Sequence, residues 1–371
     1  MTRLFRLAGL SAMAVVGLTG FLCARPAAVQ QTQTVHSDTT PLLYVANQNS
    51  ALVSIIDMTS NTVVETVDLQ ALGFSATAKP HHVVVEPDGS AWYLSLIAEN
   101  RVLKFDRDNQ LVGQLEFERP GMMALDPSSN RLYLGRSMAA VNPPQRIGVV
   151  DRTTMELDEV DVFFPRPHAI AVSRSGRFVY SASLALNQLG AYDTETDAVE
   201  LETLDGATHT MVQFALAPDG NTLLASGQLT GTLLVFDVSQ SPTIRLTGTI
   251  EVGHQPWHPV ITPDGRFLYV GNKDDNSVSV VDLETLAVVT TITGPGLAEP
   301  HGSAVSADGK YVYISNRNLK DAYTPREHDG GEEGGQVGTV VVINTASNTI
   351  ETVIEVDRYP AGMGTMTRYA Q

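Results

Sequence analysis

The chain has 371 residues, 43% of them hydrophobic, which is enough to bury a sizeable core as two average domains or as one large repeat domain. Its formal charge is −17, from 24 basic and 41 acidic residues. Such a charge repels the phosphates of nucleic acids and anionic lipid surfaces, and it argues against both as partners. A cation, by contrast, would be attracted.

Residues 1–28 have the features of an export signal that is removed from the mature protein. Arg3 and Arg6 precede an apolar stretch at 7–22, which is followed by small residues and is too short for the roughly 20 residues of a membrane span. Cys23 is the only cysteine, and the residues before it fit a lipoprotein signal poorly. We therefore expect an exported protein, periplasmic or extracellular, without a lipid anchor or a membrane span.

Residues 29–41 are polar and are expected to form a flexible lead-in, after which the chain repeats. In each repeat an acid or amide follows an apolar strand signal, as in SIIDMTSNTV and SVVDLETLAV. The seven marker residues are Asp57, Asp106, Asp151, Asp193, Asp237, Asp282 and Asn344. Their regular spacing predicts seven units, and their place after a strand predicts turn capping, not catalysis.

Each unit contains four short strand signals separated by turns such as Pro-Asp-Gly. One such sheet cannot bury both of its faces, whereas seven sheets around an axis bury each one against two neighbours. The first unit begins at its second strand, LLYVAN, and the chain ends on YPAGMGTM, which resembles a first strand. The sequence therefore predicts an all-β fold over residues 42–371: a monomeric seven-bladed β-propeller of four-stranded blades, closed by pairing of the C-terminal strand with the N-terminal blade.

The units LLYVANQNSALVSIIDMTSNTVVETV and RFLYVGNKDDNSVSVVDLETLAVVTTI resemble the YVTN repeat of exported, YncE-like bacterial and archaeal propellers. The resemblance extends over roughly residues 42–367. It implies a seven-bladed propeller that serves mainly as a binding scaffold. Asn47, Asn272 and Asn316, which close second strands in this pattern, are expected to organise loops.

Histidine recurs at one position of the unit, in KPHHVVVEPDG, PRPHAIAVSRSG, HQPWHPVITPDG and EPHGSAVSADG. Because the first strand of a propeller blade is innermost, histidines at its start should converge on one mouth of the central channel. This group consists of His81, His82, His168, His258 and His301, and His209 lies slightly earlier in its own unit.

The recurrent histidines have three interpretations. Pro-His can be a repeat consensus in which proline fixes the entry into the strand and the imidazole bonds a neighbouring loop. Alternatively, His81, His82, His168, His209, His258 and His301 can bind copper, zinc or iron through neutral imidazoles, or they can assist an organic site.

The adjacent pair His81–His82 and the AEPHG segment around His301 are similar to copper-binding segments in the propeller of nitrous-oxide reductase. That resemblance implies a copper site in the channel. The chain lacks the cupredoxin domain of that enzyme, so the resemblance does not extend to nitrous-oxide reduction.

An insertion at 317–338 belongs to the loop between the second and third strands of the seventh unit, on the histidine side of the ring. It reads either as a solvated, glycine-rich excursion or as a lid over the channel. In the second case Arg317, Arg326 and His328 are candidate ligand-binding residues. A shorter insertion at 137–146 occupies the equivalent loop of the third unit.

The sequence contains no HExxH, GxSxG or CxxC motif. We therefore expect a binding or interaction module, in preference to an enzyme, with a protein or small-molecule ligand at the histidine-rich mouth. The alternative is a metal-binding protein or a copper or iron oxidoreductase. A lactonase-like hydrolase comes third, because it would need carboxylates around a divalent ion where the first strands supply histidine.

Overall fold

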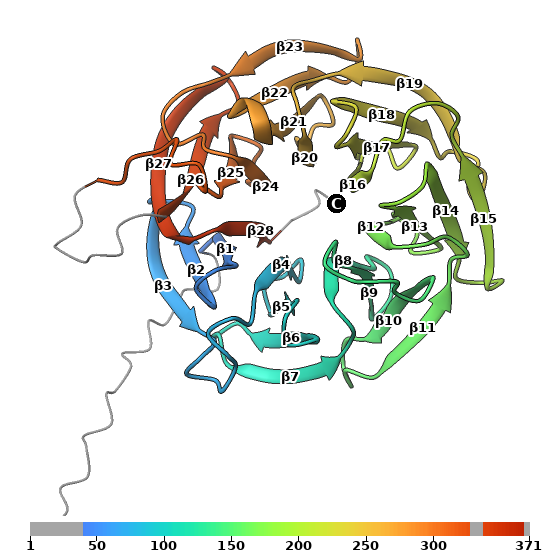
Figure 1. The fold of residues 1–371 in the computed structure, drawn as a ribbon, viewed down its shortest axis with the longest axis horizontal. Helices are drawn as coiled ribbons and strands as arrows, with labels where there is room; N and C mark the ends of the chain where they lie inside the picture. Colours follow the sequence, from blue (N-terminus) through green and yellow to red (C-terminus); the bar gives the residue numbers. More distant parts are fainter. Residues whose placement is uncertain (1–39, 327–336, 367–371) are drawn as a thin grey trace, which may run out of the picture. The chain divides into compact units, whose positions relative to one another are not determined.

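The structure, a computed structural model, describes residues 40–326 and 337–366. Within these ranges, 28 strands form seven four-stranded antiparallel sheets arranged around one axis, called the channel axis below, and the innermost strand of each sheet lies nearest this axis (Figure 1). The expected seven-bladed β-propeller is confirmed. The predicted export signal lies outside the described residues. No helix in the described ranges is long and apolar enough to cross a membrane.

From the channel outward, the first blade consists of β28 (Pro360–Thr365), β1 (Leu42–Asn47), β2 (Leu52–Asp57) and β3 (Thr62–Asp68). The second to fourth blades are β4 (Pro80–Val85), β5 (Ala91–Leu96), β6 (Arg101–Asp106) and β7 (Leu111–Glu116); β8 (Pro120–Leu125), β9 (Arg131–Arg136), β10 (Arg146–Asp151) and β11 (Leu157–Asp161); and β12 (Pro167–Val172), β13 (Phe178–Ser183), β14 (Gln188–Asp193) and β15 (Ala198–Thr203). The fifth to seventh are β16 (Met211–Leu216), β17 (Thr222–Gly227), β18 (Thr232–Asp237) and β19 (Arg245–Glu251); β20 (Pro256–Ile261), β21 (Phe267–Asn272), β22 (Ser277–Asp282) and β23 (Ala287–Ile292); and β24 (Pro300–Val305), β25 (Tyr311–Asn316), β26 (Val337–Asn344) and β27 (Thr349–Arg358). A short 3₁₀ helix, η1 (Lys273–Asp275), follows β21.

The ring closes without a covalent bond. Strand β28 pairs with β1 in the register Leu43↔Thr365 and Tyr44↔Gly364, and the Thr365 hydroxyl donates a hydrogen bond to the Leu42 carbonyl at 2.7 Å. The C-terminal strand thus supplies the inner strand of the N-terminal blade, as predicted.

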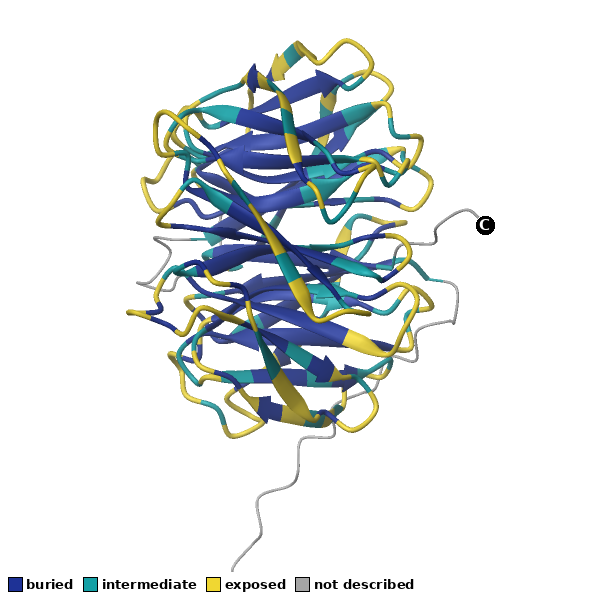
Figure 2. Cartoon of the chain, turned by 90° about the vertical axis from the view of Figure 1, so that its right-hand side faces the viewer, coloured by how far each residue is buried: buried dark blue, intermediate teal, exposed yellow. Residues whose placement is uncertain are grey.

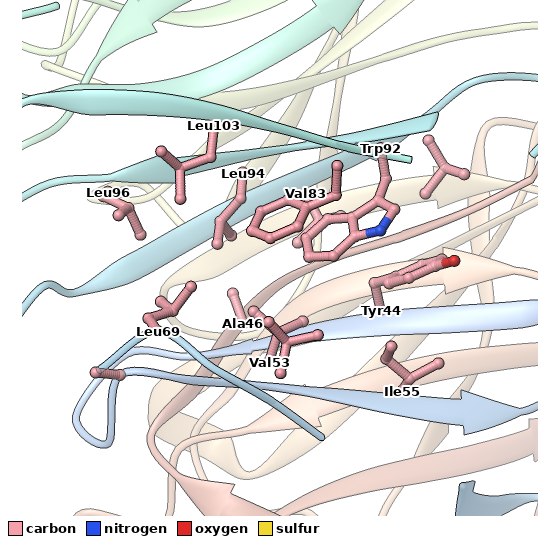
Figure 3. Close-up of a cluster of buried hydrophobic side chains, with 14 of the residues drawn as sticks. Tyr44, Ala46, Val53, Ile55, Leu69, Val83, Trp92, Leu94, Leu96 and Leu103 are labelled. Atoms are coloured by element: carbon pink, nitrogen blue, oxygen red, sulfur yellow. The ribbon is translucent and has the colours of Figure 1, made fainter. Parts of the chain in front are cut away.

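Burial decreases from the channel to the rim of the ring. All six residues of β1 are buried, whereas β23 at the rim exposes four of its six. Figure 2 shows buried residues in the interior and exposed residues along the outer strands and loops. Between the first two blades, Tyr44 and Trp92 face each other with ring centroids 4.8 Å apart, and Trp92 stacks on Phe105 at 4.0 Å (Figure 3). Because apolar side chains fill the space between neighbouring blades, each blade depends on the next for its stability.

The marker residues at the ends of the third strands cap turns. The Asp106 carboxylate accepts hydrogen bonds from the amides of Asp108 and Gln110 at 3.0 and 2.9 Å. The other six markers each accept a hydrogen bond from the amide two residues further along the chain. This confirms turn capping. Asn47, Asn272 and Asn316 are fully buried and hydrogen-bonded at the ends of second strands, as expected of loop organisers.

Candidate ligand site at the channel mouth

A β-bulge recurs at the start of every inner strand and positions the histidines. In the second blade Pro80 pairs with Leu96, but Val83 pairs with Leu94. Two residues of β4, His81 and His82, therefore lie opposite a single residue of β5. The same one-residue shift occurs in the other six blades. Because adjacent residues of a regular strand point to opposite faces, the bulge is what allows two neighbouring side chains to turn toward the channel.

The residue before each inner strand has a left-handed backbone conformation, although none of these residues is glycine. Their φ angles lie between 47° and 57° at Lys79, Arg119, Arg166, Thr210, Gln255, Glu299 and Tyr359. In six of the seven blades the next residue is proline, which starts the strand. Such a conformation costs on the order of 1 kcal/mol per residue, and its clustering is a feature of functional sites.

Serine side chains connect the bulges of neighbouring blades. The Ser95 hydroxyl accepts a hydrogen bond from the His82 amide and donates one to the Gly121 carbonyl of the next blade, both at 3.0 Å. Ser315 bonds the Gly302 amide at 2.8 Å and the Ala361 carbonyl at 2.6 Å in the same way. These bonds hold the inner strands at a defined separation around the channel.

The imidazoles of the inner strands meet at the channel mouth. The centroid of His301 lies 4.8 Å from that of His258 and 5.8 Å from that of His81, and His82 lies 6.0 Å from His258. His168 is close enough that a charge on it would lower the pKa values of His81 and His82. The five rings, at most 8% exposed, are called the imidazole cluster below. The predicted convergence of these histidines is thus seen in the structure.

Hydrogen bonds define which nitrogens carry protons in three of the rings. His81 donates from Nδ1 to the Gln48 side-chain oxygen at 3.1 Å, and His168 donates from Nδ1 to the Arg136 carbonyl at 2.6 Å. Both rings therefore present a lone pair at Nε2 when neutral. His82 differs, because its Nδ1 accepts a hydrogen bond from the Met123 amide at 3.2 Å and its Nε2 carries the proton.

Several polar atoms of the cluster are buried without a hydrogen-bond partner among the described residues. They are Nε2 of His168, Nε2 of His258, both ring nitrogens of His301 and the indole nitrogen of Trp257. A buried polar group without a partner costs about 1–3 kcal/mol. Several such atoms in one place indicate polar groups whose hydrogen bonds are completed by water or by a bound ligand.

Burial keeps the cluster neutral at physiological pH. It lowers the pKa of His82 to about 3 and that of His168 to about 4, and it lowers the pKa values of His81, His258 and His301 well below the usual value. Repulsion between the rings and from Arg317 lowers the last three further. The Ala361 backbone next to His301 raises the pKa of this ring, but by less than burial lowers it.

Arg317, the first residue after β25, lies beside the imidazole cluster. Its guanidinium lies over the rings of Trp257 and Tyr359, 4.8 and 4.5 Å from their centroids. Trp257 in turn contacts His301, with ring centroids 4.4 Å apart and ring planes tilted by 32°. Burial lowers the pKa of Arg317 to about 10, although Tyr359 and Glu299 oppose this effect, so the side chain stays charged. Arg317 thus lies beside the imidazole cluster, and its role in ligand binding stays a prediction. Trp257 and Tyr359 were not anticipated as site residues, and their position next to the recurrent proline was the available signal.

The remaining predicted residues lie elsewhere. His209 precedes β16 and its Nδ1 contacts the Thr230 hydroxyl at 2.9 Å, and it makes no ring contact with the cluster in the described chain. Arg326 donates from its backbone amide to Glu355 of the outer strand β27 at 2.6 Å. It also lines an open groove between β23 and β27 at the rim. Glu355 thus holds Arg326 at the outer strand and not over the channel mouth, where the lid alternative put it. A role of Arg326 in ligand binding stays a prediction. His328 lies outside the described residues.

No three or more His, Cys, Asp or Glu side chains in the described ranges form a group that could hold a metal ion. The rings approach one another edge to face or tilted, and Arg317 adds a positive charge beside them. Neutral imidazoles in this arrangement can donate or accept hydrogen bonds.

Comparison with known proteins supports the seven-bladed fold and gives a match to one family model over part of the chain. Residues 202–287, less than a quarter of the chain, match the model of the family described as lactonase, 7-bladed beta-propeller. The 6-phosphogluconolactonase of Yersinia pestis (strain Pestoides F) is 26% identical over 55% of this chain and 66% of its own length. YwhL of Bacillus subtilis (strain 168), described as uncharacterized, is 24% identical over 51% of this chain. The match covers 43% of YwhL, less than half of that protein.

Two solved structures share the propeller fold. A functionally unknown protein from Desulfotomaculum acetoxidans DSM 771 has a TM-score of 0.70 and 11% identity, covering 88% of this chain and 99% of that one. The dihydro-heme d1 dehydrogenase NirN has a TM-score of 0.59 and 13% identity, covering 89% of this chain and 76% of NirN. These likenesses support the seven-bladed fold and, at such identities, nothing about activity.

Proposed function

We propose that the protein is an exported binding propeller that holds a small polar molecule between the imidazole cluster and Arg317. The observation that carries the proposal is the set of buried ring nitrogens without partners in His168, His258 and His301. A purely structural cluster would be expected to satisfy these atoms, because each one left unpaired destabilises the fold. The left-handed residues that introduce every inner strand are a second sign of a site maintained at a cost in stability.

Hydrolysis of a sugar lactone is a second candidate function. It is supported by the lactonase family match over residues 202–287 and by the similarity to a 6-phosphogluconolactonase. The chemistry would need a base to activate water, and an imidazole that is neutral at pH 7 with a lone pair at Nε2 can fill that role. His81 and His168 have this tautomer.

Metal binding, the alternative raised by the sequence, has partial support from the same two residues. A metal-binding histidine usually donates its second nitrogen to an oxygen acceptor, as His81 and His168 do. The Nε2 proton of His82 and the charge of Arg317 oppose a cation at this place. We therefore rank copper, zinc or iron binding below the binding of a small molecule.

Thermal unfolding of untagged protein tests the proposal. The probes are glucono-δ-lactone, gluconate, glucose 6-phosphate, glucose, Zn²⁺ and Cu²⁺, and acid release from the lactone is followed separately. At a hundredfold excess over Kd, a bound probe should stabilise the fold by about 2.7 kcal/mol. The His258→Gln/His301→Gln double variant should lose this response, and His254→Gln, an exposed histidine beside Asp275, should keep it. Equal responses in the wild type and the double variant would place the binding site elsewhere.

A further inference from the structure

Three carboxylates near Arg317 at the channel mouth are engaged by neighbouring groups. Glu299 accepts hydrogen bonds from the amides of Leu319 and Lys320, at 2.5 and 3.1 Å. Asp275 accepts from His254, and Asp274 accepts from Gln255 and Lys320. These three carboxylates therefore have partners other than Arg317.

Four cations at the same mouth have no carboxylate within 4 Å among the described residues: Lys79, Arg119, Arg166 and Arg317. The first three have a left-handed backbone conformation, and each directly precedes the inner strand of one of three consecutive blades. Arg119 and Arg166 donate to the carbonyls of Ile97 and Met138, at 3.3 and 2.7 Å, which places them over the loops of the mouth. These four side chains therefore place positive charge at the mouth.

Arg317 is the deepest of the four, and only 7% of it is exposed. Its guanidinium contacts the rings of Trp257 and Tyr359, and the edge with its N–H donors is the available recognition surface. Its Nε is buried and has no hydrogen-bond partner in the described chain. The edge of a guanidinium matches a carboxylate or phosphate in a planar, bidentate arrangement.

The geometry points to an oxyanion as the group that this site recognises: a carboxylate or phosphate on a small molecule, bound by the edge of Arg317 beside the imidazoles of His258 and His301. This inference rests on the proposed function and names the chemical class of its ligand. Lys79, Arg119 and Arg166 draw the anion to the mouth. The charge of −17 on the whole chain repels polyanions, which restricts the ligand to a small species.

The inference revises the expectation that this chain attracts a cation. Net charge describes the field far from the protein, whereas the field in the channel depends on the nearest groups, which solvent screens least. At this mouth the nearest groups are neutral imidazoles and an arginine without a carboxylate partner in the described chain.

The test compares wild type with three variants. Arg317→Met removes the charge but keeps an apolar side chain of similar length. Arg317→Lys keeps the charge but loses the planar N–H donors. Arg245→Met is the control, because it removes an exposed arginine of the outer strand β19 that pairs with Asp237. The probes are inorganic phosphate and gluconate, with glucose as the neutral counterpart of gluconate. Binding is measured by calorimetry and by the shift in melting temperature, at constant ionic strength set with NaCl.

We expect phosphate, gluconate or both to bind wild type, and glucose to bind at least tenfold more weakly. Binding by gluconate alone assigns a carboxylate ligand, and binding by phosphate alone assigns a phosphate ligand. Arg317→Met should weaken binding by about thirtyfold, in line with the loss of a charged hydrogen bond of roughly 2 kcal/mol. The affinity of Arg317→Lys for the anions should lie between those of wild type and Arg317→Met. Arg245→Met should bind the anions as tightly as wild type does.

The melting temperature of the free protein gives an independent readout. A buried cation without a partner destabilises a fold, so Arg317→Met should melt at the same temperature as wild type or higher. A purely structural Arg317 would instead lower the melting temperature when replaced. The inference is overturned if neither anion binds more tightly than glucose, or if Arg317→Met binds the anions as wild type does. If glucose or the lactone binds and the His258→Gln/His301→Gln variant abolishes that binding, the proposed function stands and the anion assignment alone fails.

Discussion

The imidazole cluster should make the stability of the protein strongly dependent on pH between 6.5 and 5. In the folded state burial keeps five imidazoles neutral, with pKa values of about 3 for His82 and about 4 for His168. In the unfolded chain the same groups are protonated near pH 6.5. Acid therefore favours the unfolded state. The full contribution of the cluster is present above pH 6.5 and is lost as the pH falls toward the folded pKa values.

The magnitude follows from the number of rings. Each imidazole that stays neutral in the fold lowers the free energy of unfolding by about 1.4 kcal/mol per pH unit below pH 6.5, or about 2 kcal/mol at pH 5. His82 and His168, with pKa values of about 3 and 4, together remove about 4 kcal/mol at pH 5, and the other three rings act in the same direction. That is a large part of the stability of an ordinary domain, about 5–15 kcal/mol. Acid unfolding is therefore expected near pH 5, before most carboxylates titrate.

Urea denaturation at intervals from pH 7.5 to 5 measures this slope. Replacing His301 with glutamine should reduce the slope near pH 5 by about 1.4 kcal/mol per pH unit, the equivalent of one proton. Neither ring nitrogen of His301 has a hydrogen-bond partner in the described chain, so the replacement breaks no such bond. His254→Gln serves as the exposed control. A free energy of unfolding that stays level between pH 7 and 5 would refute the argument, because the imidazoles would then be accessible to protons in the fold.

Two further predictions concern the strand β28, which closes the ring and packs against β4 beside the imidazole cluster. Deleting residues 360–371 removes β28, so the first blade loses its inner strand; circular dichroism should show no cooperative melting, and size-exclusion chromatography should show aggregates. A truncated protein that melts like the full chain would contradict closure by β28. At Gly362 a Cβ atom would lie 2.5 Å from the His81 carbonyl oxygen and 2.9 Å from the His82 Cα. Gly362→Ala should therefore cost about 1–3 kcal/mol in urea denaturation and impair ligand binding. Gly248→Ala, where no heavy atom lies within 4 Å of the new Cβ, should change stability by less than about 0.5 kcal/mol. Equal effects of the two substitutions would show that the close approach of β28 to β4 is not required.

The number of blades, their boundaries and the closure of the ring were all predictable from the sequence. Each unit carries the same local signals, and the markers from Asp57 to Asn344 cap their turns through amides only two residues away. Local chemistry of this kind is legible in sequence because the interacting groups are close in the chain. The missing strand of the first unit and the surplus strand at the C-terminus then allowed only one pairing, which β28 and β1 make.

The chemical character of the site depended on contacts between blades. A strict alternation of strand side chains would have sent His81 and His82 to opposite faces, and the bulge at Pro80 overrides it. The tautomer of His82 depends on an amide 41 residues away, and Arg317 contacts the rings of Trp257 on β20 and of Tyr359 before β28. Arg326, nine residues after Arg317, lies instead beside Glu355 on the outer strand.

Net charge was the least informative feature of the sequence for this site. It predicted attraction for a cation, whereas the mouth carries engaged carboxylates and four cations without a carboxylate partner in the described chain. The composition determined the total charge, but only the arrangement of the blades decided which charges meet at the channel. Because electrostatic energy depends on distance and burial, the residues that recognise a ligand became evident only in the tertiary structure.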